Sequence, residues 1–370
     1  MLTNEFRPFD LNDMVGNETI INEMKKHSDS EDMKGFPEVM IFEGESGSGK
    51  TTLAFIVAAL LSDPAPIQKR GYKVPNPESP SSKAILSERF GRDVYFMDAS
   101  NMGKDDVLAL ELKLSTKTMF DKHRIIIIDE AQALSSAGKG ATLKLLEKKR
   151  KGVYVILCTM DISSFDKATR SRAQCYKFKP VSASDISDYL YKILEKTGEI
   201  ENVPEVFLTE TLLAISDAAG GSVRWAVQIL QRCLSSEIYT EKEIMEEFGI
   251  LSEKNLYSIF DRMLRGDYTA LEFVRSVEKK EFLQRFCAQL SGAMLYYATK
   301  DCKEEWKIRQ YNSWKEEHVA HLLKTSLSLL QRPWLNDSVF YGEYVLAMRE
   351  AFKTTLLEAA APKKITRATE

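Results

Sequence analysis

Short apolar runs alternate with helical patterns through the first half of the chain. Four runs have the length and composition of buried strands, and they are residues 39–42, 94–97, 124–128 and 153–157. Residues 176–178 are a candidate fifth strand. Because continuous apolar strands that alternate with helices are typical of sheets covered on both faces, the pattern predicts a parallel α/β sheet.

The pattern becomes helical after Pro180. Helical periodicity is found in residues 184–196, 209–219 and 222–235, and it continues from 252 to 361, with its clearest stretches at 282–298 and 339–360. A chain of 370 residues has room for several domains. We therefore expect an α/β domain over 1–180, a small helical domain over 181–240, a second helical domain over 241–361 and a tail over 362–370.

Residues 63–92 interrupt the α/β pattern. Five of the 11 prolines lie in this segment, separated by serines and charged residues. Proline removes a backbone donor and restricts the residue before it, so such segments are poor strands and helices. We expect an inserted surface segment that takes no part in the core.

Composition excludes several classes of protein. The net charge of −3 and the pI near 6.0 argue against a globally basic nucleic-acid coat. The five cysteines are scattered without a C-x-x-C pair, so we expect free thiols rather than disulfides or a zinc site. The chain shows no membrane span and no secretory signal, which makes a cytoplasmic protein the expectation.

Residues 44–51 match the G-x-x-x-x-G-K-[ST] pattern between a predicted strand and a predicted helix. Glycines allow backbone N–H groups to surround phosphate oxygens, and the helix adds its positive end. Lys50 would reach the β- and γ-phosphates, and the hydroxyl of Thr51 would bind Mg²⁺. The expected nucleotide-binding residues here are Gly44, Glu45, Ser46, Gly47, Ser48, Gly49, Lys50, Thr51 and Thr52.

Two acidic residues follow the isoleucine-rich run at 125–128. Ligands of α/β sheets lie at the carboxyl ends of the strands, which is where Asp129 and Glu130 are expected. Asp129 would hold Mg²⁺, and Glu130 would orient and polarise an attacking water. An isolated pair of acids is commonly a solvated strand end, but the phosphate loop favours the catalytic interpretation.

These motifs resemble those of AAA+ ATPases, in particular the gamma/tau subunit of bacterial clamp loaders and the replication factor C small subunits. Further segments that resemble this family are residues 7–8, 14–17, 98–101, 129–132, 141–147, 156–159, 169–172 and 221–224. The resemblance implies an AAA+ domain, a helical lid and an all-α collar that mediates oligomerisation. It also implies that ATP and Mg²⁺ are bound.

The resemblance assigns roles to individual residues. Arg7, Pro8, Val15 and Gly16 would line the adenine pocket, Thr159 would sense the γ-phosphate, and Arg224 would reach the nucleotide from the lid. Arg172 would be an arginine finger inserted into the ATP site of a neighbouring subunit. The alternative for both arginines is a solvated or salt-bridged surface residue. A permanently charged planar guanidinium suits the phosphate-binding role.

Polar and basic residues near the ends of several predicted helices are candidates for contact with the DNA backbone. The candidates are Asn101, Lys104, Lys139 and Lys144. Further basic positions are Lys113, Lys117 and residues 148–151. Each lysine taken alone is also consistent with a solvated helix face. Together with the resemblance, the set favours DNA contact.

Some positions depart from the family pattern. The four-cysteine zinc module of bacterial gamma subunits is replaced here by the proline-rich segment, so we predict no zinc. Ala173 stands where the family has cysteine, and Gln132 stands where it usually has histidine. We expect neither side chain to be needed for phosphate chemistry. These changes indicate a divergent lineage, and a viral origin is one alternative. A viral protein would be expected in the host cytoplasm.

The function implied is that of an ATPase subunit of a sliding-clamp loader. Such a subunit would assemble with other loader subunits into a ring, pentameric by resemblance, and would act on a sliding clamp and primer-template DNA. Two alternatives stay open. One is a structural loader subunit that does not hydrolyse ATP, and the other is a different AAA+ DNA-remodelling motor such as a helicase loader.

Overall fold

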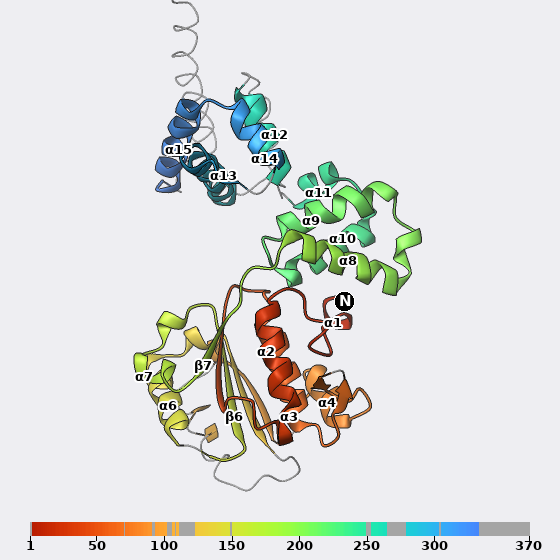
Figure 1. Cartoon of the computed structure of the whole chain (residues 1–370), viewed down its shortest axis with the longest axis vertical. Helices are drawn as coiled ribbons and strands as arrows, with labels where there is room; N and C mark the ends of the chain where they lie inside the picture. Colours follow the sequence, from red (N-terminus) through yellow and green to blue (C-terminus); the bar gives the residue numbers. More distant parts are fainter. Residues whose placement is uncertain are drawn as a thin grey trace, which may run out of the picture. The chain divides into compact units, whose positions relative to one another are not determined.

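The computed structural model describes residues 2–69, 71–90, 93–101, 106–107, 109–110, 123–148, 150–248, 253–264, 279–302 and 305–332. The chain divides between Ile238 and Tyr239 into two compact units (Figure 1). The first unit holds the sheet and the candidate site. The second is helical throughout its described part.

A five-stranded parallel sheet forms the centre of the first unit. Its strand order is β4-β5-β6-β1-β7, and the strands are β1 (Val39–Glu43), β4 (Val94–Asp98), β5 (Arg124–Asp129), β6 (Val153–Thr159) and β7 (Gln174–Lys177). Every pairing in this sheet is parallel. The predicted parallel sheet is therefore confirmed, including the fifth strand, which begins two residues earlier than the sequence pattern indicated.

The register of the strands brings their carboxyl ends to one edge of the sheet. Asp129 pairs with Asp98 on β4, and Thr159 pairs with Glu43 on β1. Ile128, which precedes Asp129, pairs with Leu157 on β6. The residues that end β5 and β6 consequently lie at the same edge as the loop that follows β1, which is where α/β proteins bind ligands.

Helices cover both faces of the sheet (Figure 1). On one face Ile125 and Ile127 join the core formed with α2 (Glu18–Asp29) and α3 (Lys50–Ser62). On the other face Ile126 and Ile128 pack with residues of α6 (Ser136–Glu147). Successive side chains of a strand point to opposite faces, so a run of four isoleucines contributes to both cores.

The proline-rich segment is more than a surface excursion. It forms the hairpin β2 (Ile67–Lys69) and β3 (Tyr72–Val74), followed by α4 (Pro80–Leu86). Tyr72, Val74 and Ile85 are buried in the same core as α3, so the expectation that this segment takes no part in the core was wrong. The sequence pattern concealed this because three scattered apolar side chains among prolines show no periodicity.

A buried carboxylate organises the proline-rich segment. Asp63, at the end of α3, accepts hydrogen bonds from Ala65 N at 2.9 Å, Asn76 N at 2.6 Å and Ser82 Oγ at 2.8 Å. These bonds satisfy a carboxylate that is only 6% exposed. The segment is thus held to the end of α3 by hydrogen bonds as well as by its apolar side chains.

A helical bundle follows the sheet within the first unit. It consists of α8 (Ala183–Thr197), the π-helical turn η6 (Phe207–Thr211), α9 (Leu212–Ala218) and α10 (Val223–Ser236), which correspond to the predicted helices. Ser182 caps α8 by accepting a hydrogen bond from Asp185 N. The amino-terminal α1 (Leu2–Glu5) lies against α10, and Leu2 N donates to Gln231 Oε1 at 2.9 Å.

Short helices and turns complete the first unit. The 3₁₀ turns are η1 (Glu31–Met33), η2 (Ala99–Asn101), η3 (Ala131–Ala133), η4 (Ile162–Ser164) and η5 (Glu199–Glu201), and one further short helix is α7 (Lys167–Arg170). The turn η3 comes directly after the Asp129-Glu130 pair. It therefore controls where the side chains that follow β5 lie.

The second unit is built from α11 (Glu241–Phe248), α12 (Glu253–Leu264), α13 (Lys279–Thr299), α14 (Glu305–Ser313) and α15 (Glu316–Leu330). Its core contains Tyr257, Phe286 and Trp314, and the hydroxyls of Tyr257 and Tyr311 are 2.6 Å apart. The predicted helix over 339–360 and the tail over 362–370 lie outside the described residues. Within the described ranges, no helix has the length and apolarity of a membrane span.

A buried ion pair at the start of β5 gives a stability prediction. Arg124 Nε lies 3.1 Å from Asp93 Oδ1, and the two side chains are 4% and 2% exposed. Asp93→Ala removes the carboxylate and leaves the buried guanidinium without it, so we expect a loss of about 3–5 kcal/mol in the free energy of unfolding. Urea denaturation measures this change.

The matched control for this prediction is Glu78→Ala. Glu78 pairs with Lys83 at 3.1 Å, but its side chain is 83% exposed. Solvent screens such a pair, so its removal is expected to cost less than about 1 kcal/mol. Equal losses in the two variants would contradict the structural role of the buried pair.

Candidate nucleotide-binding site

The glycine-rich loop joins β1 to α3 and lies against the start of α10. Gly47 has φ +79° and Gly49 has φ +101°, backbone conformations that L side chains rarely adopt. A Cβ on Gly47 would lie 2.0 Å from Ser222 Oγ, and one on Gly49 would lie 2.9 Å from Met14 Cε. Val223 N donates to Gly47 O at 3.2 Å. The glycines therefore allow the close approach of this loop to its neighbours.

Lys50 is the first residue of α3, and its side chain turns back into the loop. Its Nζ donates to Gly44 O and to Glu45 O, both at 2.8 Å, and the residue is only 6% exposed. Burial lowers the pKa of Lys50, whereas the nearby groups of Cys158, Glu130 and Asp129 act in the opposite direction. A buried cation beside a helix amino terminus favours an anionic ligand.

Thr51 and Asp129 come from different elements and are in direct contact. Thr51 Oγ1 donates to Asp129 Oδ2 at 2.9 Å, and Glu130 N donates to Asp129 Oδ1 at 3.0 Å. Burial raises the pKa of Asp129, and these two hydrogen bonds oppose that shift. A hydroxyl and a carboxylate are hard oxygen donors of the kind that bind Mg²⁺ together with phosphate and water. The residues present therefore fit a magnesium-bound phosphate group.

Glu130 and Thr159 are joined by one side chain. Gln132 Nε2 donates to Glu130 Oε2, and Gln132 Oε1 accepts from Thr159 Oγ1 at 3.0 Å and from Met160 N at 3.1 Å. Thr159 is fully buried at the end of β6. Glu130 has a left-handed backbone, with φ 48°, which begins η3 and places Gln132 next to Thr159.

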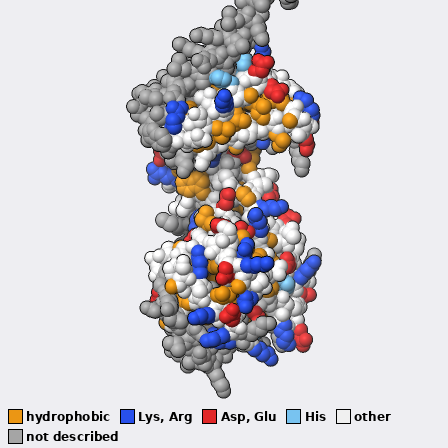
Figure 2. Space-filling model, turned by 90° about the vertical axis from the view of Figure 1, so that its left-hand side faces the viewer, with side chains coloured by type: hydrophobic (Ala, Val, Ile, Leu, Met, Phe, Trp, Pro, Cys, Tyr) orange, Lys and Arg blue, Asp and Glu red, His pale blue; other side chains and the backbone are white. Residues whose placement is uncertain are grey.

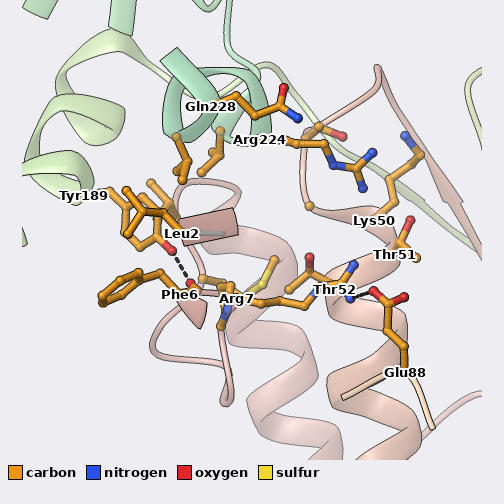
Figure 3. Close-up of a pocket in the computed structure, with 18 residues that line it drawn as sticks. Leu2, Phe6, Arg7, Lys50, Thr51, Thr52, Glu88, Tyr189, Arg224 and Gln228 are labelled. Atoms are coloured by element: carbon orange, nitrogen blue, oxygen red, sulfur yellow. Dashed lines mark hydrogen bonds and ion pairs between the residues drawn. The ribbon is translucent and has the colours of Figure 1, made fainter. Parts of the chain in front are cut away.

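A cavity of about 340 Å³ is lined by most of the predicted nucleotide-binding residues, whereas Asp129, Glu130 and Thr159 are not among its lining residues (Figure 3). Those that line it are Arg7, Pro8, Val15, Gly47, Ser48, Gly49, Lys50, Thr51, Thr52 and Arg224. Arg224 reaches the cavity from α10, so the glycine-rich loop with α3 and the helical bundle both contribute. The cavity lies within the first unit, because both of these parts belong to it.

The two ends of the cavity differ in chemistry. In Figure 3, Leu2, Phe6 and Tyr189 lie on one side, and Lys50, Thr51 and Arg224 lie on the other. Tyr189 donates its hydroxyl to Phe6 O, and burial raises the pKa of Tyr189 to about 12. One end is apolar and the other is cationic, which fits the base and the phosphates of a nucleotide.

Arg7 is held at the cavity by two neighbours. Its guanidinium lies 4.8 Å from the centroid of the Phe55 ring, and it forms an ion pair with Glu88. Glu88 follows α4 and comes from the proline-rich segment, which thereby reaches the cavity. Stacking and ion pairing fix the plane of the guanidinium at this position.

Sequence reasoning missed several lining residues. They are Leu2, Phe6, Glu88, Tyr189, Val227 and Gln228, whereas Met14 and Val223, which also line the cavity, lie in segments that the resemblance had indicated. Val227 and Gln228 follow Arg224 by three and four positions, so helical periodicity alone could have placed them on the same face of α10. Glu88 and Tyr189 come from separate parts of the chain, and no local pattern relates them to the loop.

Other predicted residues lie near the cavity without lining it. Gly44 and Glu45 provide the carbonyls that accept from Lys50, and Ser46 is exposed. Gly16 lies beside Val181, whose Cγ1 would be 3.0 Å from a Cβ at that glycine. These positions support the shape of the site, and their predicted contact with a nucleotide stays a prediction.

Arg172 lies outside this cavity. Its guanidinium donates to Ala168 O at 2.8 Å and pairs with Glu147 at 3.2 Å, and its side chain is 39% exposed. It lines a different cavity, of about 520 Å³, together with Glu147 and Arg150. The structure thus separates Arg172 from the loop that ends at Lys50.

The candidate DNA-contacting residues are spread over the first unit. Asn101 is exposed in η2, and on α6 Lys144 is exposed while Lys139 is half-buried. Lys104 lies outside the described residues, as do Lys113 and Lys117. Figure 2 faces the side that carries α6 and α7 in Figure 1, and it shows lysines and arginines mixed with acidic and apolar side chains. DNA contact stays a prediction.

A phosphate loop after the first strand, acids at the edge of the neighbouring strand and an arginine from a helical bundle define an α/β P-loop protein of the AAA+ type. No group of three or more His, Cys, Asp or Glu in the described part of the chain is placed to hold a metal. The predicted lack of zinc stays a prediction.

Comparisons with known proteins show which AAA+ proteins this chain is similar to. A family model described as "DNA polymerase III, delta subunit" matches residues 16–182. The DNA polymerase III subunit gamma of Buchnera aphidicola subsp. Schizaphis graminum is 26% identical over 274 residues, which are 72% of this chain and 70% of that protein. The replication factor C small subunit of Haloarcula marismortui is 24% identical over 270 residues, or 72% of each chain.

Two solved structures resemble the fold at low identity. Thermotoga maritima RuvB, a Holliday junction branch migration motor, has a TM-score of 0.47 and 15% identity, with 70% of this chain and 79% of that chain covered. The Bacillus subtilis DNA clamp loader delta protein has a TM-score of 0.41 and 12% identity, with 86% and 96% covered. The family model and the sequence relatives are clamp-loader proteins, and this chain is similar to them.

Proposed function

We propose that the chain is an ATPase subunit of a sliding-clamp loader, which uses ATP binding and hydrolysis to open a clamp and place it on primer-template DNA. The observation that carries this proposal is the connected site at the edge of the sheet. Lys50 lies in the loop, Thr51 contacts Asp129, and Gln132 ties Glu130 to the end of β6. A loader subunit with a purely structural role would not need these contacts.

Each residue has a defined task in this proposal. Lys50 exchanges its bonds to the loop carbonyls for bonds to phosphate oxygens, and Arg224 approaches the same phosphates from α10. Thr51 and Asp129 hold Mg²⁺, which when bound neutralises charge on the phosphates. Glu130 orients and polarises the attacking water. Arg7, Pro8 and Val15 enclose the adenine.

Assembly completes the site. Arg172 lies outside its own cavity and is partly exposed, which supports a role in the ATP site of an adjacent subunit. We expect a ring of like or unlike loader subunits, pentameric by resemblance, held together through the helical domain over 241–361. The domain over 181–240 acts as the lid. ATP favours the ring state that grips the clamp, and hydrolysis releases it.

The DNA is contacted through its phosphates by Asn101, Lys104, Lys139 and Lys144 in this proposal. Such contacts do not depend on sequence and weaken as salt rises. The protein acts in the compartment that holds the replicating DNA, which is the cytoplasm in a bacterial cell or in a host cell infected by a virus.

The test is phosphate release from the purified assembly, measured with and without primed DNA and its clamp. We expect hydrolysis that the two partners stimulate jointly. A rate of phosphate release that neither primed DNA nor the clamp changes would favour a different AAA+ motor, such as a helicase loader. Tight ATP binding without phosphate release under all conditions would favour a structural subunit.

A further inference from the structure

The side chain of Gln132 connects Glu130, which follows β5, to Thr159 at the end of β6. Its Nε2 donates to Glu130 Oε2, and its Oε1 accepts from Thr159 Oγ1 at 3.0 Å. Gln132 itself is half-buried, and Thr159 is fully buried. One side chain therefore contacts both the residue expected to orient water and the residue expected to sense the γ-phosphate.

The orientation of this amide is set by the backbone. Met160 N donates to Gln132 Oε1 at 3.1 Å. A backbone N–H can only donate, so the carbonyl of Gln132 must face Met160 and Thr159. The NH₂ group then necessarily faces the Glu130 carboxylate, where it acts as a donor to an acceptor-only group. Rotation of the amide by 180° would place two donors against each other.

The Thr159 hydroxyl has one proton and two acceptors within reach. It donates to Gln132 Oε1 at 3.0 Å and lies 3.1 Å from Asp161 O. When this proton is shared with Gln132, turning it towards a phosphate oxygen breaks the hydrogen bond to Gln132. The arrangement around Thr159 is therefore connected to the carboxylate of Glu130 through a single amide.

We propose that Gln132 is a positioning residue that couples Thr159 to Glu130, so that contact of Thr159 with a γ-phosphate and placement of the Glu130 carboxylate influence each other. The proposal rests on the proposed function. It revises the expectation that the side chain at this position has no part in phosphate chemistry. Because coupling between two sites is reciprocal, a change at Thr159 must affect Glu130 through Gln132, and a change at Glu130 must affect Thr159.

The turn that carries Gln132 is also held by contacts that do not involve its side chain. The turn η3 is held by hydrogen bonds from Ala133 N to Glu130 O at 2.8 Å and from Leu134 N to Ala131 O at 3.3 Å. Ala131 and Leu134 are buried in the core under the sheet. Substitutions of Gln132 should therefore leave the thermal unfolding temperature close to that of the wild type, which checks that each variant is folded.

Two variants test the proposal. Gln132→Met keeps the length of the side chain and removes its hydrogen bonds, and Gln132→Glu keeps the shape but removes the donor and faces Glu130 with a like charge. We expect single-turnover hydrolysis to fall by about 10–100-fold in each, with the dissociation constant for ADP within about threefold of the wild type. Wild-type hydrolysis in Gln132→Glu would overturn the proposal.

A binding measurement provides a readout that is independent of turnover. The ratio of the dissociation constants for ADP and ATPγS reports how strongly the site senses a γ-phosphate. It is measured for the wild type, Glu130→Ala, Gln132→Met and the double variant. If Gln132 carries the coupling, Glu130→Ala changes the ratio in the wild type and leaves it unchanged in the Gln132→Met background.

Equal effects of Glu130→Ala in both backgrounds would overturn the proposal, because the two positions would then act independently. The cycle also separates this proposal from the proposed function. A wild-type protein that binds both nucleotides and never releases phosphate contradicts the proposed ATPase, whereas the binding ratios still decide whether Gln132 couples its neighbours.

Discussion

Arg172→Ala is expected to lower the ATPase turnover of the assembled protein by about 10³-fold or more while ATP affinity stays unchanged. An arginine finger supplied by a neighbour stabilises charge in the transition state of phosphoryl transfer, and its removal has effects of this size. Arg172 is suited to this role because it lies away from the cavity of its own chain and is 39% exposed. Turnover and nucleotide affinity are measured separately on the same assembly.

Arg170→Ala is the matched control for the finger. Arg170 is exposed and lies two positions before Arg172, at the end of α7. Its removal should leave turnover near the wild-type value. Arg172→Lys should remain strongly impaired, because an ammonium lacks the planar fork of a guanidinium. Full turnover in the Arg172→Ala assembly, or an equal loss on removal of Arg170, would refute the assignment.

Glu130→Gln is expected to reduce hydrolysis by about 10²–10⁴-fold while ATP stays bound. The amide keeps the shape of the side chain but cannot act as a base towards water. Asp129 retains its contact with Thr51 in this variant, so the metal-binding residues are unaffected. Rapid quench of a single turnover measures the chemical step, and filter binding measures the retained ATP.

The outcome for Glu130→Gln separates catalysis from binding. Loss of ATP binding in parallel with hydrolysis would show that Glu130 supports the site structurally. Hydrolysis at the wild-type rate would show that another group orients the water. Retained ATP with slow hydrolysis is the result that the catalytic role requires.

Local sequence patterns predicted the part of the site whose residues are close together in the chain. The loop from Gly44 to Thr51 and the acids after the isoleucine run were identified because each motif is contiguous and follows a strand. Parallel pairing then brings the strand ends to one edge, so the contact between Thr51 and Asp129 follows from the fold class. This part needed no knowledge of side-chain packing.

The remaining contacts depend on distances between separate segments. Glu88 meets Arg7 only because α4 packs beside α3, and Tyr189 reaches Phe6 from α8. The contacts of Gln132 could not be predicted from the sequence, because one of its partners, Thr159, lies on another strand. Tyr72, Val74 and Ile85 were misjudged for the same reason, since prolines around them hid three core positions.

The most direct test of the central claim is the binding of ATP by the purified chain in the presence and absence of Mg²⁺. The account predicts saturable binding of ATP with magnesium, and clearly weaker binding when EDTA removes the metal that Thr51 and Asp129 are expected to hold. Failure of the purified protein to bind ATP with magnesium would contradict the account.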